Sequence, residues 1–419
     1  MIYKANIIDT PTKDEFRIVP NGYVHVLDDG KIAGVYEQLP AELANEPVTD
    51  YGDKLLIPAF YDLHVHAPQY RNLGLALDLP LLEWLETYTF PEESKFRDIA
   101  YAEHVYRRFV HELWMQGTMR SSVFASAHTE ATFKLMDIFR EAGLGAYVGL
   151  TGMDRNCPEA VQNTTEEVQA FLERAFKEQD PLVRPIITPR FIPTCSRTML
   201  KMMGKMAKQY NLPVQSHLSE NKNEIQWVHK LMPETICYAD GYRKYGLLGE
   251  TPTLMAHCCY TKGIELRMVK RHHVMVVHCP TSNCNLGSGA APIRRFLDNG
   301  IPVALGTDVS GGHNMSVLRV IQYAIQTSKL YQILTPRKEA FLKVSEAFYL
   351  ATKSGGSFFG QCGSFEPGYD FDALVVDDAY LNHEKYELNQ RIERYIFLGD
   401  DRDIKVRFCA GKEIKEPQL

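Results

Sequence analysis

The hydrophobic and polar positions divide the chain into a long central region and two shorter ends. Between about Leu55 and Phe359, apolar runs of strand length alternate with longer segments of helical periodicity. The runs are almost continuously apolar and rich in β-branched residues, as is typical of strands buried on both faces of a parallel sheet. They comprise Leu55–Pro58, Ala146–Leu150, Val183–Ile187, Pro213–His217, Thr253–Ala256, Val274–His278 and Val303–Gly306.

Both ends of the chain have the pattern of short strands and turns. The segment from Asn21 to Leu39 holds two alternating apolar runs around Asp28-Asp29-Gly30, which predicts a hairpin. Near the other end, Phe371–Val376 and Val406–Gly411 are predicted to be strands.

Repeated β–α units favour a closed (β/α)8 TIM barrel over an open doubly wound sheet. A dinucleotide-binding fold lacks its main support, because no GxGxxG motif follows the first strand. We therefore predict an α/β protein of two parts. Residues 56–361 form the barrel, and residues 1–55 together with 362–419 form a smaller β-sandwich domain.

Composition adds several exclusions. Hydrophobic residues make up 45% of the 419 residues and charged residues 23%, an ordinary globular mixture. The formal net charge of -6 argues against a nucleic-acid or anionic membrane surface, which needs a local excess of Lys and Arg. The first residues lack a secretory pattern, and no apolar run reaches the roughly 18 residues of a membrane span. The nine cysteines, without pairing rhythm, suit free thiols. These features predict a cytoplasmic protein.

His64-Val65-His66 is the strongest local sign of chemistry. Alternate residues of a strand point the same way, so both imidazoles can reach one metal ion. If a barrel strand ends there, they lie at the carboxyl-terminal mouth, where barrel active sites lie. Two histidines at this spacing also meet by chance, and the motif alone leaves both interpretations open.

Three further residues with metal-binding side chains end apolar runs: His217, His257 and Asp308. Any one of them could be a hydrogen-bonded core histidine or a helix N-cap aspartate. Five such residues at the same end of successive strands indicate a metal site instead. Three imidazoles and one carboxylate leave a coordination position for water, and the bound cation can lower the pKa of that water to about 7. The residues therefore point to a metal-activated hydroxide.

Several longer motifs resemble the amidohydrolase superfamily. They are PAFYDLHVHA (58–67), SHLSE (216–220), MAHC (255–258), HCPTSN (278–283) and LGTDVSGG (305–312). Others resemble its guanine deaminase branch, namely LHVHAPQY (63–70), LPLLEWLETYTFP (79–91), ITPRF (187–191) and FLGDDR (397–402). The resemblance spans essentially the whole chain. It implies hydrolysis of the 2-amino group of guanine, giving xanthine and ammonia in purine salvage or catabolism.

The resemblance also implies roles for single residues. His64, His66, His217 and Asp308 would hold one Zn²⁺ per chain, although Fe²⁺ also suits these ligands. Relatives with two metals use a lysine on the fourth strand, and Val183–Arg190 contains none.

The expected catalytic residues are Glu220, Asp308 and His257. Asp308 would accept the proton of the water, and His257 would lie beside both metal and substrate. Glu220 would protonate the ring nitrogen and then the leaving amine, unless it is an ordinary first-turn helix acid.

The expected substrate-binding residues are Gln69, Trp84, Leu85, Arg190, Phe191 and His257. Arg190 offers a planar donor fork to a purine carbonyl oxygen, and Phe191 offers a face for stacking. The alternatives are a surface ion pair for the arginine and core packing for the phenylalanine. A homodimer is expected from the resemblance.

Two other functions remain open at this point. A related enzyme acting on another aminated heterocycle, such as a triazine, 8-oxoguanine or cytosine, would share much of the metal set. A non-catalytic relative could use the barrel as a scaffold, but such proteins usually lose metal ligands.

Overall fold

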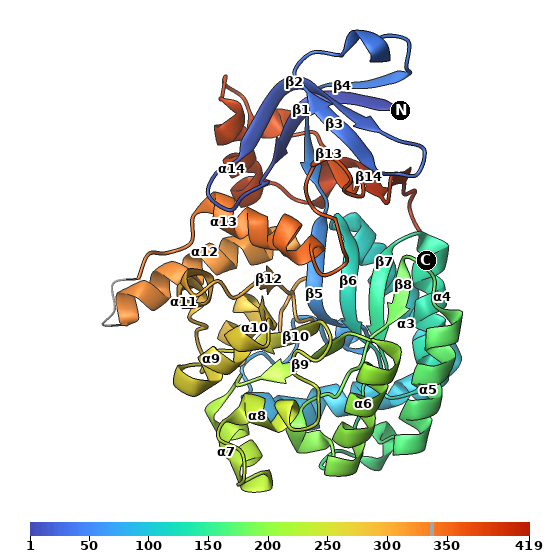
Figure 1. The fold of residues 1–419 in the computed structure, drawn as a ribbon, viewed down its shortest axis with the longest axis vertical. Helices are drawn as coiled ribbons and strands as arrows, with labels where there is room; N and C mark the ends of the chain where they lie inside the picture. The colour runs from blue at the N-terminus through green and yellow to red at the C-terminus, as the bar shows by residue number, and fades with distance from the viewer. Residues whose placement is uncertain (336–338) are drawn as a thin grey trace.

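The computed structural model describes residues 1–335 and 339–419 and contains the predicted parallel barrel. Two four-stranded sheets have the orders β5-β6-β7-β8 and β12-β11-β10-β9, and every pairing in them is parallel. Figure 1 shows these strands inside a ring of helices. The strands are β5 (Phe60–His66), β6 (Thr118–Phe124), β7 (Gly145–Gly149), β8 (Val183–Pro185), β9 (Val214–Leu218), β10 (Thr253–His257), β11 (Met275–His278) and β12 (Val303–Leu305).

Hydrogen bonds close the barrel at both junctions between these sheets. Beyond β8, Ile187 N donates to Pro213 O at 2.9 Å, next to β9. Beyond β12, Asp308 N donates to His64 O at 2.8 Å and His66 N donates to Val309 O at 3.2 Å. The last two bonds hold the His64–His66 segment directly against Asp308. The barrel is therefore closed at the edge where the predicted metal residues lie.

The helices lie mainly between successive strands in the chain and pack their apolar faces on the barrel. They are α1 (Leu81–Trp84), α2 (Phe90–Glu93), α3 (Ile99–Met115), α4 (Thr129–Ala142), α5 (Thr165–Glu178), α6 (Arg197–Tyr210), α7 (Lys222–Leu231), α8 (Tyr238–Arg243), α9 (Gly263–Arg271), α10 (Pro280–Asn285), α11 (Ile293–Asp298), α12 (Val317–Leu334), α13 (Val344–Tyr349) and α14 (Leu388–Leu398). None of the helices in residues 1–335 and 339–419 has an apolar stretch that could cross a bilayer.

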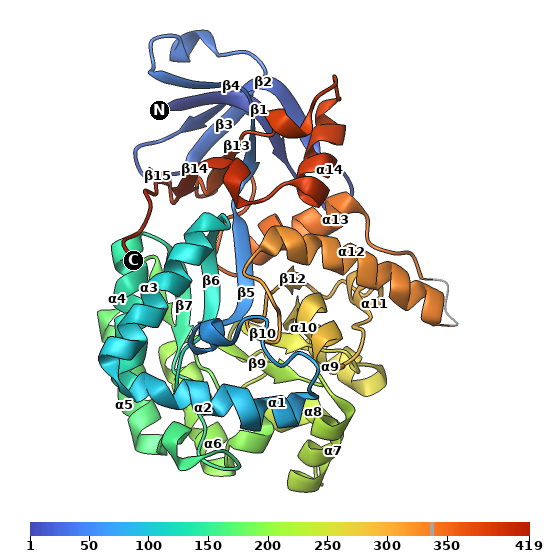
Figure 2. The same ribbon diagram turned by 180° about the vertical axis from the view of Figure 1, so that it is seen from behind.

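Shorter helical turns fill several connections. The π-helical turns are η3 (Leu85–Thr89) and η7 (Leu350–Ser354). The 3₁₀ turns are η1 (Ala41–Leu43), η2 (Ala67–Asn72), η4 (Ser94–Arg97), η5 (Glu159–Val161), η6 (Ile192–Thr194), η8 (Ala379–Leu381) and η9 (Asp401–Asp403). In Figure 2, α1 and α2 lie at the end of the barrel away from the terminal strands.

The two ends of the chain form strands, as predicted, and these strands make one continuous mixed sheet beside the barrel where a β-sandwich was expected. Its order is β15-β14-β13-β4-β1-β2-β3. The strands are β1 (Ile2–Asp9), β2 (Arg17–Val26), β3 (Ile32–Tyr36), β4 (Val48–Pro58), β13 (Ala373–Val376), β14 (Ile404–Cys409) and β15 (Lys412–Glu413). The predicted hairpin is confirmed, because β2 and β3 pair as antiparallel neighbours.

One strand lies in a different sheet from the one predicted. Leu55–Pro58 was expected among the barrel strands, but it forms the end of β4 and pairs with β13 of the mixed sheet. The first barrel strand is β5, which begins directly after Ala59. An apolar run has the same appearance in either sheet, so the pattern could not separate them. The domain limits at residues 55 and 361 stay a prediction.

Candidate metal centre and active site

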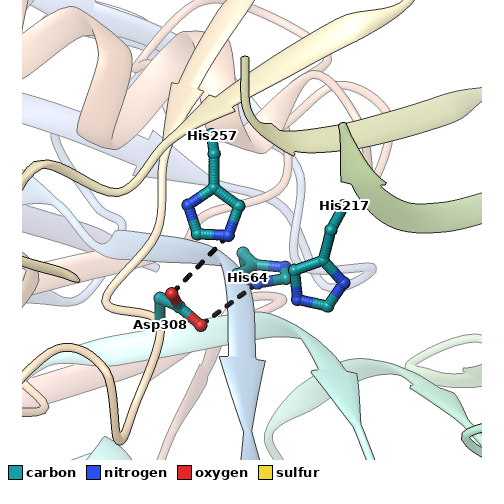
Figure 3. Close-up of side chains that lie close together, drawn as sticks. All are labelled: His64, His217, His257 and Asp308. Atoms are coloured by element: carbon teal, nitrogen blue, oxygen red, sulfur yellow. Dashed lines mark ion pairs between the residues drawn. The ribbon is translucent and has the colours of Figure 1, made fainter. Parts of the chain in front are cut away.

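Four strand ends bring the predicted metal-binding side chains together. His64 and His66 close β5, His217 lies in β9, His257 ends β10, and Asp308 follows β12. Ligand atoms of His64, His217, His257 and Asp308 lie within 4.8 Å of one another (Figure 3). All four belong to parallel strands, whose carboxyl ends meet at one mouth of a barrel. The side chains of the predicted cluster therefore meet at one mouth of the barrel.

The distances between Asp308 Oδ1 and the nearest histidine nitrogens fit ligands of a small, tetrahedrally coordinated cation. Asp308 Oδ1 lies 3.2 Å from His64 Nε2 and 3.3 Å from His66 Nε2. His66 Nε2 lies 3.3 Å from His217 Nε2. Ligands held at about 2.0–2.1 Å by a tetrahedral zinc ion are about 3.3–3.4 Å from one another. Three of the distances among His64, His66, His217 and Asp308 thus match those between ligands in a coordination shell, whereas the group whose ligand atoms all lie within 4.8 Å of one another contains His257 in place of His66.

His257 stands on the other side of the same carboxylate. Its Nε2 lies 3.7 Å from Asp308 Oδ2 and 3.6 Å from Glu220 Oε2. His257 Nε2 and His64 Nε2 are both buried and make no hydrogen bond within the described residues. Both nitrogens face carboxylate oxygens of Asp308 without a hydrogen bond, an arrangement that fits a site built for a cation and its ligands.

Hydrogen-bond acceptors next to His217 and His257 determine the orientation of their imidazole rings. His217 Nδ1 donates to the backbone oxygen of Arg190 at 2.6 Å, and His257 Nδ1 donates to Asn283 Oδ1 at 2.9 Å. A proton held on Nδ1 leaves Nε2 as the free lone pair. Both rings therefore present Nε2 to the centre. Asn283 lies in the HCPTSN motif, but no role was predicted for it from the motif alone.

The environment favours ligand-competent protonation states. Burial lowers the pKa of His66 to about 4 and holds the pKa of His217 well below its usual range. Burial alone would raise the pKa of Asp308, but His64, His66 and His257 together hold it well below its ordinary value. Neutral imidazoles and an ionised carboxylate are the forms that bind a divalent cation.

Glu220 lies next to this cluster and is buried. Ser288 Oγ donates to its Oε1 at 2.6 Å, while Oε2 faces His257. Burial, with a smaller contribution from the charge of Asp308, raises the pKa of the Glu220 carboxyl to about 8. A carboxyl group that titrates near neutral pH can both give and take a proton. Ser288 lies in none of the motifs and was not predicted to contact Glu220.

One cavity joins the metal-binding cluster to the predicted base-binding residues. It is lined by His66, Gln69, Leu81, Trp84, Leu85, Arg190, Phe191, His217, Glu220, His257, Leu286, Asp308 and Gly311. Every predicted substrate-binding residue is among them. Phe191 packs edge-on to His217 with ring centroids 6.5 Å apart, and Trp84 Nε1 has no hydrogen-bond partner in the described chain.

Arg190 differs from the expectation in one respect. Its terminal nitrogens donate to Glu93, from Nη1 to Oε2 at 2.6 Å and from Nη2 to Oε1 at 3.1 Å. The end of the guanidinium fork is therefore occupied by a protein carboxylate and not open to a purine oxygen. Glu93 was missed because an acid in TFPEE has the pattern of an ordinary first helical turn.

Two further histidines in or next to the quoted motifs, His278 and His313, do not line this cavity. His278 ends β11 and is buried, and burial lowers its pKa to about 3. His313 Nδ1 lies 3.0 Å from Asn285 Nδ2.

Comparison with known proteins agrees with this geometry. The chain matches the model of the amidohydrolase family over residues 55–414. It is 36% identical to guanine deaminase of Dictyostelium discoideum, over 99% of this chain and 98% of that protein. The human guanine deaminase is 33% identical over 99% of this chain and 96% of its own length.

A solved structure extends the likeness to the whole fold. The crystal structure of guanine deaminase from C. acetobutylicum, with guanine bound in its active site, superposes with a TM-score of 0.97 and 48% identity. The match covers 99% of both chains. Full-length identity at this level, together with the His and Asp cluster, shows the family: the chain belongs to the guanine deaminases of the amidohydrolase family.

Proposed function

We propose that this protein hydrolyses guanine at C2, giving xanthine and ammonia, at a single divalent cation. The observation that carries the proposal is a single cavity lined by the imidazole and carboxylate cluster, by the buried Glu220, and by the aromatic and aliphatic side chains of Trp84, Leu85 and Phe191. The full-length relatives named guanine deaminase support the substrate.

His64, His66, His217 and Asp308 would hold the cation, because their ligand atoms share the 3.2–3.3 Å spacing around Asp308 Oδ1 and His66 Nε2. We propose zinc as the native metal, one ion per chain; iron suits the same ligands. When bound, the cation supplies a Lewis acid that makes water a nucleophile near neutral pH. His257 faces the opposite oxygen of Asp308 and is proposed to contact the water and the substrate.

The protein groups then move the protons. Asp308 takes a proton from the attacking water, and Glu220 delivers a proton to N3 of guanine as the C2–O bond forms. In the second step the proton of the C2 hydroxyl passes through the same carboxylates to the amino group, the C2–N bond breaks, and ammonia leaves. Glu220 suits both steps because burial, and then the charge of Asp308, raises the pKa of its carboxyl well above the usual range.

The base pocket is proposed to hold the purine between apolar walls. Trp84 and Leu85 come from α1 and η3, and Phe191, which precedes η6, adds an aromatic ring to the lining. Gln69 and Arg190 supply polar edges. We also propose a homodimer and a cytoplasmic location, as is expected for this family.

The first test measures ammonia release from guanine, 8-oxoguanine, adenine, cytosine and melamine-type triazines, with metal content determined on the same sample. We expect turnover of guanine, one equivalent of metal, and loss of activity with a chelator that added zinc restores. Preference for another heterocycle would refute the substrate and leave the metal site intact. A silent protein with a full metal complement would refute the substrate class.

A further inference from the structure

Glu93 is a buried carboxylate behind the base pocket. It ends α2, and its side chain is 2% exposed, against 4% for its partner Arg190. Both terminal nitrogens of Arg190 donate to it, at 2.6 and 3.1 Å. A two-bond pair of this kind fixes the plane of the guanidinium as well as its position.

The same carboxylate also fixes Gln69. Gln69 Nε2 donates to Glu93 Oε1 at 2.9 Å, and the backbone N–H of Ser310 donates to Gln69 Oε1 at 3.0 Å. A carboxylate only accepts and a backbone N–H only donates. The amide of Gln69 therefore has one orientation, with its nitrogen toward α2 and its oxygen toward Ser310.

These bonds determine what the pocket can offer a base. Gln69 keeps one N–H and one oxygen lone pair. Arg190 has one N–H of each terminal nitrogen engaged by Glu93, and Met153 Sδ lies 3.8 Å from Nη1. The Nε–H and the second N–H of Nη2 remain, side by side on one edge of the guanidinium. The pocket thus has a set pattern of donors, and the charge of Arg190 is already balanced.

We propose that Glu93 is a specificity-determining positioning residue for the reaction; this inference rests on the proposed guanine deamination. By holding Arg190 and Gln69, Glu93 sets the donor pattern that captures guanine. By balancing the charge of Arg190, it keeps the pocket suited to a neutral purine. Xanthine loses a ring proton more readily than guanine does, so a neutral pocket also avoids retaining the anionic product.

A purely structural role is the competing explanation, and the adjacent Glu92 provides a matched control. Glu92 is buried too, at the same end of the same helix, but it pairs with Lys95 at 2.6 Å and with the Tyr101 hydroxyl. It does not line the cavity. A change of Glu92 to Gln therefore removes a similar charge without touching the polar groups of the pocket.

The experiment compares wild type, Glu93→Gln and Glu92→Gln. Steady-state kinetics with guanine is combined with calorimetric affinities for xanthine and hypoxanthine in mildly alkaline buffer, where xanthine is largely an anion and hypoxanthine largely neutral. For Glu93→Gln we expect KM to rise about 10-fold or more, with kcat changed much less, as befits loss of charge-assisted hydrogen bonds. Its preference for xanthine over hypoxanthine should also rise about 10-fold relative to wild type. Glu92→Gln should match wild type in both respects.

A second variant covers failure of Glu93→Gln to fold. The double variant Glu93→Leu, Arg190→Met replaces both members of the buried ion pair by apolar side chains. Such a replacement often leaves the stability of a protein unchanged. This variant should bind guanine weakly without gaining the preference for xanthine, because the unbalanced charge is gone.

An unchanged KM and an unchanged xanthine preference in a folded Glu93→Gln protein would overturn the inference, as would guanine capture at wild-type strength by the double variant. Failure of the proposed function is a separate result. It would appear as wild-type protein that releases no ammonia from guanine, and the affinity ratios do not depend on turnover.

Discussion

Glu220 combines burial, a single fixed hydrogen bond and closeness to His257. Ser288 Oγ holds one carboxyl oxygen at 2.6 Å, and the other lies 3.6 Å from His257 Nε2. A carboxylate on a solvent-exposed helix turn would be neither buried nor held by such contacts. These contacts favour the proton-transfer role over the first-turn helix acid that the sequence left open.

We expect Glu220→Gln to bind metal like wild type and to lower kcat for guanine by about 10²–10⁴-fold, because only proton transfer is removed. Metal content and kcat are measured on the same preparation. Turnover close to that of wild type would exclude Glu220 as the proton shuttle. Loss of metal would instead show that its role is structural.

Backbone conformation also contributes at the residue scale. His257 and Asp308 have φ values of 70° and 50°, in the left-handed region that residues other than glycine rarely adopt. Each such residue costs about 1 kcal/mol or more and persists where the surroundings determine it. Here the strand-end hydrogen bonds, such as Asp308 N to His64 O at 2.8 Å, hold the backbone and aim both side chains at the centre.

At the scale of elements, Asp62 joins the first and last barrel strands behind the metal ligands. Its Oδ1 accepts from His64 N at 3.2 Å and from Thr307 N at 3.0 Å, and its Oδ2 accepts from the Thr307 hydroxyl. Asp62 is fully buried in β5, and Thr307 directly precedes Asp308. The carboxylate thus sets the distance between His64 and Asp308.

We expect Asp62→Ala to weaken metal binding by about 10–100-fold, because groups that orient ligands typically have effects of this size. Asp62→Asn is the matched control, since its amide oxygen can still accept from both backbone N–H groups and its binding should stay near that of wild type. The measurement is competition for zinc with a chromogenic chelator. Equal affinities for wild type and Asp62→Ala would contradict this role.

At the scale of the whole molecule, a buried polar network connects the barrel to the mixed sheet. Arg120 of β6 donates to Asp372 through Nε at 2.7 Å and Nη2 at 3.1 Å. The Tyr61 hydroxyl of β5 donates to the same carboxylate at 2.7 Å, and Ala410 N donates to it at 2.6 Å. Asp372 precedes β13, so one side chain connects the sheet to two barrel strands.

We expect Asp372→Asn to destabilise the protein by about 1–3 kcal/mol, because it removes one charge from the buried network while Asp370, 2.8 Å from Arg120 Nη2, still pairs with the arginine. The folded fraction should keep its metal content and its kcat, since the network lies away from the cavity. The urea midpoint is the measurement, and Asp50→Asn is the control. Asp50 forms an exposed pair with Lys4, and its loss should leave the midpoint unchanged. Equal midpoints for the two variants would contradict the proposed role of the network.

The barrel, the terminal β segments and the polar residues at strand ends could all be predicted from the amino-acid pattern. This was possible because strand periodicity and strand direction are local, and parallel strands bring all their carboxyl ends to one mouth. His64, His66, His217, His257 and Asp308 were accessible to this reasoning, and Gln69 and Arg190 were accessible through resemblance.

The surroundings of those residues, in contrast, depend on how distant parts of the chain meet in the fold. Glu93 meets Arg190 across 97 residues, and Asp62 meets Thr307 across 245. A buried acid and a solvated acid have the same appearance in a short motif, and Leu55–Pro58 fits either sheet. The difference lies in which distant groups the closed barrel places opposite each side chain. Because these groups are buried in a medium of low dielectric constant, their contacts orient the amide of Gln69 and balance the charge of Arg190. Burial also raises the pKa of Glu220.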